Sequence, residues 1–205
     1  MYFCTRFNQG TIFRLPSNFF RIVLDFLYPI EDFFVQKKYI SQTIGGKIKK
    51  HTRKEGLPDL SGVQVAIFSL SNSENILKNS FRDAFYSLYY GNWDISLADL
   101  GNIPEGTTQE DTFVAIKEVT THLLKQGIIP ILLAEGVENT YALYRSFDTM
   151  EQMVNLACVN ALFGFSDEYE IFAEDSYMSR ILMETPTQLN HFTNIGYQTY
   201  YNPQE

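Results

Sequence analysis

The chain has 205 residues, of which 45% are hydrophobic, 15% aromatic and 20% charged. This composition fits one folded domain with a core, or a domain with an appendage, and excludes a largely disordered chain. No run of about 18 apolar residues is present, so we expect no transmembrane helix, and the N-terminus lacks the regions of a signal peptide. The two cysteines, Cys4 and Cys158, do not suggest a disulfide framework and favour a cytoplasmic location.

The net charge of −8 is unevenly distributed. Residues 1–56 hold ten Lys/Arg and four Asp/Glu, a net +6, whereas residues 57–205 hold six and twenty, a net −14. We interpret the basic run GGKIKKHTRKEG (45–56) as a solvated linker rather than a contact for nucleic acid or a membrane. The acidic remainder would repel phosphate, so we expect neither nucleic acid nor a membrane as a partner.

Residues 1–56 are rich in aromatic side chains, then basic, and show no regular periodicity. We interpret them as an N-terminal extension that packs on the domain or on a partner. Residues 57–205 form the expected α/β domain, because strand and helix patterns alternate there.

The expected elements can be placed in chain order. They are strands over 63–70, 93–101, 128–133, 153–165 and 192–201, and helices over 73–91, 107–127, 139–152 and 173–186. Ser73 is a candidate N-cap, Gly91 and Gly127 end their helices, and the first turn of the second helix carries acidic side chains. Such alternation predicts a mostly parallel sheet with helices on both faces, a three-layer α/β/α domain. Cys158 is expected to be a small buried hydrophobe in a strand.

Several catalytic motifs are absent from the sequence. It contains neither of the two glycine-rich phosphate-binding motifs and no nucleophile elbow. His51, His122 and His191 are far apart and share no motif, so we expect structural roles for all three.

Two groups of carboxylates remain as candidates for binding. The stretch FSDEYEIFAEDS places Asp167, Glu168, Glu170, Glu174 and Asp175 close together. It lacks the ligand spacing of a calcium loop, so a solvated acidic loop is favoured over a cation site. Glu135 and Glu138 follow the strand 128–133 directly, and ligands enter open α/β sheets at the carboxyl ends of strands.

Two stretches resemble the ureohydrolase superfamily of arginases, agmatinases and formimidoylglutamases. They are GIIPILLAEGVENTYALYRSF (127–147) and VNLACVNALFGF (154–165), and they are most similar to divergent arginase-like proteins of Bacteroidetes-type bacteria. The family pattern is a P-I-x-L strand, then Gly-Gly-Asp-His-Ser-x-Thr-Tyr. The matching residues here are Pro130, Ile131, Leu133, Thr140 and Tyr141. NSFRDAFYSLYYG, ADLGNIPEGTTQED and FTNIGYQTYY add further similarity, so that the resemblance covers about 57–201.

The metal ligands that the resemblance implies are replaced. The histidine of Gly-Gly-Asp-His corresponds to Val137, and the three ligands of Asp-Ala-His-x-Asp correspond to Asn160, Leu162 and Gly164. The third ligand cluster of the family would follow the last strand and lies outside this sequence. Valine, leucine and glycine cannot hold a manganese pair or activate its water, so we predict no catalytic residue, no metal ligand and no cofactor.

We therefore expect an arginase-like α/β domain truncated to about five strands, corresponding to the N-terminal two thirds of the family fold. Our hypothesis is a pseudoenzyme that acts as a binding or assembly module. An uncovered sheet edge, and the oligomers that the resemblance implies, favour self-association. One alternative is a manganese-dependent hydrolase of linear amidines or guanidines. A second is a sensor for a small cationic ligand, with Glu135, Glu138 and Asn160 as the candidate ligand-binding residues.

Overall fold

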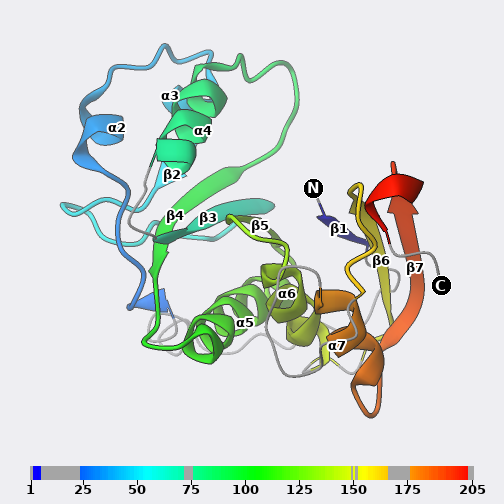
Figure 1. Ribbon diagram of the computed structural model, residues 1–205. Helices are drawn as coiled ribbons and strands as arrows, with labels where there is room; N and C mark the ends of the chain where they lie inside the picture. Colours follow the sequence, from blue (N-terminus) through cyan, green and yellow to red (C-terminus); the bar gives the residue numbers. More distant parts are fainter. Residues whose placement is uncertain are drawn as a thin grey trace. The chain divides into compact units, whose positions relative to one another are not determined.

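The computed structural model describes residues 2–5, 24–71, 76–148, 150, 152–165 and 176–202 (Figure 1). The chain forms two compact units, which are described separately. Unit 1 comprises Met1–Thr11 with Glu135–Glu205, and unit 2 comprises Ile12–Ala134.

Unit 2 is built on a parallel sheet of four strands in the order β2-β4-β3-β5. The strands are β2 (Lys49–Lys50), β3 (Val65–Ser71), β4 (Leu97–Pro104) and β5 (Ile129–Leu133). The middle of β3 and of β4 is buried on both faces, as the apolar runs of a covered parallel sheet require. The pairing of β3 with β4 shifts register between Ile67 and Ser69.

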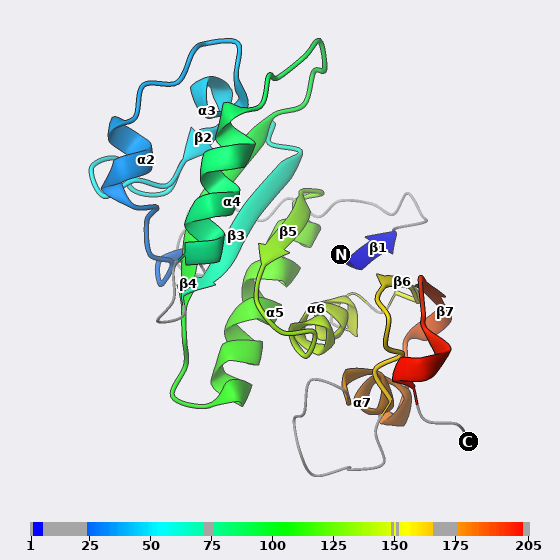
Figure 2. The same cartoon turned by 45° about the horizontal axis from the view of Figure 1, so that its top comes forward.

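The helices of unit 2 lie on both sides of this sheet (Figures 1 and 2). They are α2 (Asp32–Gln36), α3 (Ile44–Lys47), α4 (Ile76–Ser87) and α5 (Gln109–Lys125). Helix α5 begins with a capping box, in which Thr108 and Asp111 each accept a hydrogen bond from the other's backbone N–H. It ends before Gly127, whose φ of +75° is the left-handed conformation that glycine adopts without strain.

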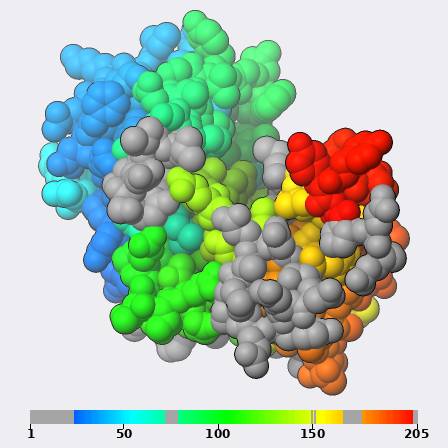
Figure 3. All heavy atoms as spheres, viewed as in Figure 1, coloured from blue at the N-terminus to red at the C-terminus, as the bar shows by residue number. Residues whose placement is uncertain are grey.

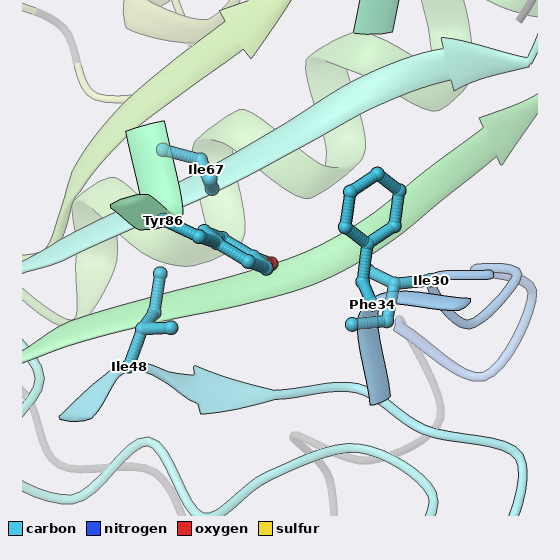
Figure 4. Packing of buried hydrophobic residues seen from close by; sticks show 5 residues of the cluster. All are labelled: Ile30, Phe34, Ile48, Ile67 and Tyr86. Carbon is cyan, nitrogen blue, oxygen red and sulfur yellow. The ribbon is translucent and has the colours of Figure 1, made fainter. Parts of the chain in front are cut away.

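The core on the α4 side of the sheet joins residues that are distant in sequence (Figure 4). Ile30, Phe34 and Ile48 pack with Ile67 of β3 and Tyr86 of α4. The ring of Phe34 meets that of Tyr86 edge to face at 5.9 Å between centroids. Burying a large apolar side chain stabilises a fold by about 1.5–3 kcal/mol. This part of the 1–56 segment therefore contributes directly to the stability of unit 2.

Unit 1 contains a second, three-stranded sheet in the order β1-β6-β7. Its elements are β1 (Tyr2–Thr5), α6 (Asn139–Asp148), β6 (Val154–Val159), α7 (Tyr177–Met183), β7 (Leu189–Ile195) and the 3₁₀ turn η1 (Thr199–Tyr201). Strand β7 is parallel to β6, and β1 is antiparallel to it. Val154, Leu156 and Cys158 alternate as the buried face of β6. The prediction of a buried, free Cys158 is confirmed.

The predicted fold class, α/β with a mostly parallel sheet and helices, is confirmed. The single five-stranded sheet that we expected is instead two sheets in the described residues. No helix in these ranges is both long and apolar enough to span a membrane.

The bounds of three expected strands were wrong. The strand expected over 153–165 is Val154–Val159. The strand expected over 93–101 is Leu97–Pro104, because Trp93, although apolar, is 74% exposed in the segment before it. The strand expected over 192–201 is Leu189–Ile195, since Gly196 takes a φ of +87° and ends it. The proposed cap Ser73 lies outside the described residues.

Candidate functional site

The loop after β5 folds back on itself. Gly136 has a φ of +86°, and a β-carbon there would overlap the carboxylate of Glu138. The buried Asn139 side chain donates to the carbonyls of Glu135 (2.8 Å) and Gly136 (3.2 Å) and to Oε1 of Glu138 (3.3 Å). Glu138 is therefore held against its own loop, Val137 is half-buried beside it, and Glu135 is exposed.

The helix start that follows, at Thr140 and Tyr141, ties α6 to α7. The Tyr141 hydroxyl donates to Glu184, and the Arg180 guanidinium lies 4.0 Å from the centre of the Tyr141 ring. Arg145 donates to the Tyr141 oxygen at 3.3 Å and pairs with Glu184. Burial, and next the hydrogen bond to Glu184, raise the pKa of the Tyr141 hydroxyl, which therefore remains a donor.

The loop after β6, which contains the candidate residue Asn160, is held by amide side chains. Asn160 Oδ1 accepts the N–H of Leu162 at 3.2 Å. Asn194 donates to the Leu162 carbonyl at 2.8 Å. Asn202 accepts the N–H of Phe163 at 3.0 Å and donates to the carbonyl of Ala161 at 2.9 Å. The loop's backbone is thus fixed by neutral side-chain hydrogen bonds, including one to the oxygen of the candidate residue Asn160.

Gly164, at the end of this loop, is packed against Tyr177 of α7. Its φ is +76°, and an added β-carbon would lie 2.7 Å from Cδ1 and Cζ of the Tyr177 ring, closer than the 3.0 Å that real β-carbons essentially never pass. Tyr177 is 1% exposed, and its hydroxyl donates to Sγ of Cys158 at 3.5 Å. The space that a side chain at position 164 would need is therefore filled by a buried ring.

The other candidate residues occupy separate places. His51 is buried with Nδ1 2.9 Å from the Leu100 carbonyl oxygen, His122 is buried in α5, and His191 lies exposed on β7. In the part of the chain that the structure describes, no three His, Cys, Asp or Glu side chains are close enough together to hold a metal ion. The acidic stretch 167–175 lies outside the described residues.

A buried polar network in unit 2 was not anticipated from the sequence. Arg82 binds both carboxylate oxygens of Asp99, through Nε at 2.8 Å and Nη2 at 3.0 Å, and both residues are at most 1% exposed. The Tyr86 hydroxyl donates to Asp99 Oδ2 at 2.7 Å, and the N–H of Gly101 donates to Oδ1 at 2.9 Å. Arg82 Nη1 donates to Oδ1 of Asn102 at 2.9 Å. This network joins α4 to the middle of β4.

The electrostatics of the network formed by Arg82, Asp99 and Tyr86 favour a structural role. Burial, reinforced by the neighbouring Asp99, raises the pKa of the Tyr86 hydroxyl, so this group stays protonated and donates its hydrogen bond. Removing one member of such a buried ion pair typically costs about 3–5 kcal/mol. The stretches that signal it are NSFRDAFYSLYYG and ADLGN, which the sequence resemblance had already singled out.

Comparison with solved structures places this architecture among arginase-like folds. Formimidoylglutamase from Bacillus subtilis matches with a TM-score of 0.62 at 14% identity, over 82% of this chain and 56% of that one. A formiminoglutamase from Trypanosoma cruzi, solved with Mn²⁺, matches with a TM-score of 0.61 at 12% identity, over 78% and 59%. Arginase from Medicago truncatula matches with a TM-score of 0.56 at 10% identity, over 70% and 52%.

No protein-family model and no curated protein sequence matches the chain. The chain spans just over half the length of the three solved proteins. At these identities the likeness shows the fold alone, which is an arginase-like α/β fold.

Proposed function

We propose that this chain is a non-catalytic arginase-like module that binds a partner instead of hydrolysing a substrate. The positions that correspond by resemblance to the family's metal ligands are Val137, Asn160, Leu162 and Gly164. A manganese pair needs several carboxylates or imidazoles to balance its charge and to lower the pKa of a bridging water. Of these four residues only Asn160 has a side-chain oxygen, which is neutral.

The packing of Gly164 against Tyr177 is the observation that supports this proposal best. A lost ligand could be compensated by a nearby carboxylate if the loop kept room for one. Here a buried aromatic ring fills the space at position 164, and a β-carbon would already overlap it. Restoring a carboxylate at this position would require Tyr177 to leave the core of unit 1.

The local hydrogen bonds of the two loops also support a non-catalytic role. Asn160 Oδ1 accepts the Leu162 N–H, and the Glu138 carboxylate lies against Gly136. A metal or a guanidinium group at these oxygens would compete with contacts that both loops already make. We therefore favour a binding module over the hydrolase and over the sensor of cationic ligands.

The proposal can be tested by activity and by ligand binding. The full chain, incubated with Mn²⁺, is assayed for hydrolysis of arginine, agmatine and formimino-glutamate, and the same compounds are screened by thermal shift. We expect no turnover above the blank and no rise in melting temperature, since a ligand stabilises only a fold that binds it. Manganese-dependent turnover that is lost in Glu138→Ala but kept in Glu110→Ala, an exposed control on α5, would overturn the proposal.

A further inference from the structure

We draw no further inference here: the strongest candidate, the surface patch of exposed apolar side chains that Leu88, Tyr89 and Trp93 contribute just after α4 in unit 2 (Figure 3), carries none because nothing in the structure shows what covers it.

Discussion

Replacing Gly164 by alanine probes the contact on which the proposed function depends. The φ of +76° alone costs an L-residue about 1–2 kcal/mol. The new methyl group must also enter the volume of the Tyr177 ring, and overpacking a buried site costs typically about 1–3 kcal/mol more. We expect Gly164→Ala to lower the free energy of unfolding by about 2–5 kcal/mol.

Gly196→Ala is the matched control in the same unit. Gly196 has a similar φ of +87°, but an added β-carbon would meet nothing within 4 Å. Gly196→Ala should therefore lower the free energy of unfolding only by the cost of its backbone conformation. Urea unfolding followed by circular dichroism measures both variants, and hydrogen exchange in peptides covering β6 reports on unit 1 alone.

The same substitution in a Tyr177→Leu background completes a double-mutant cycle. The excess cost of Gly164→Ala over Gly196→Ala should shrink when the ring is absent, giving a coupling energy of about 0.5–3 kcal/mol. Equal destabilisation by Gly164→Ala and Gly196→Ala would show that Tyr177 does not fill this space, and the reasoning would fail.

Three further predictions concern unit 2. Arg82→Met should destabilise the chain by about 3–5 kcal/mol in urea unfolding, whereas Lys37→Met, which removes a more exposed ion pair, should destabilise it far less. Thr108→Ala should cost about 1 kcal/mol through the lost cap of α5, and the exposed neighbour Thr107→Ala should cost much less. Burial, and next Lys125, lower the pKa of His122 below its ordinary 6.5, so its contribution to stability is full above pH 6.5 and is lost as the pH falls through the folded-state pKa. His122→Gln should therefore flatten the acid side of the stability profile measured by urea unfolding.

The parts of the fold that follow from local chemistry were predictable. Helix α5 is marked in the sequence by acidic residues in its first turn and by Gly127 after its end, and the structure places it within two residues of the expected bounds. The buried position of Cys158 follows from its apolar strand. The start of β4 was missed because apolar content predicts burial, and Trp93 is exposed in the segment before the strand.

The site depended on contacts that periodicity does not reveal. The resemblance assigns Gly164 to a ligand position of the family, but only the fold places Tyr177 against it. Likewise, the hydrogen bonds of Asn194 and Asn202 to the loop at 160–164 join residues 32 and 39 to 41 positions apart. The pairing of Arg82 with Asp99 was missed for the same reason, since a helix and a strand meet only in the tertiary structure.

The manganese content of the purified chain tests the central claim most directly. The protein is incubated with excess Mn²⁺, freed of unbound metal by gel filtration, and analysed for metal per chain. We predict far less than one manganese ion per chain, because Val137, Leu162 and Gly164 offer no ligand and Asn160 Oδ1 accepts the Leu162 N–H. Stoichiometric manganese that is lost in Asn160→Ala would contradict the account.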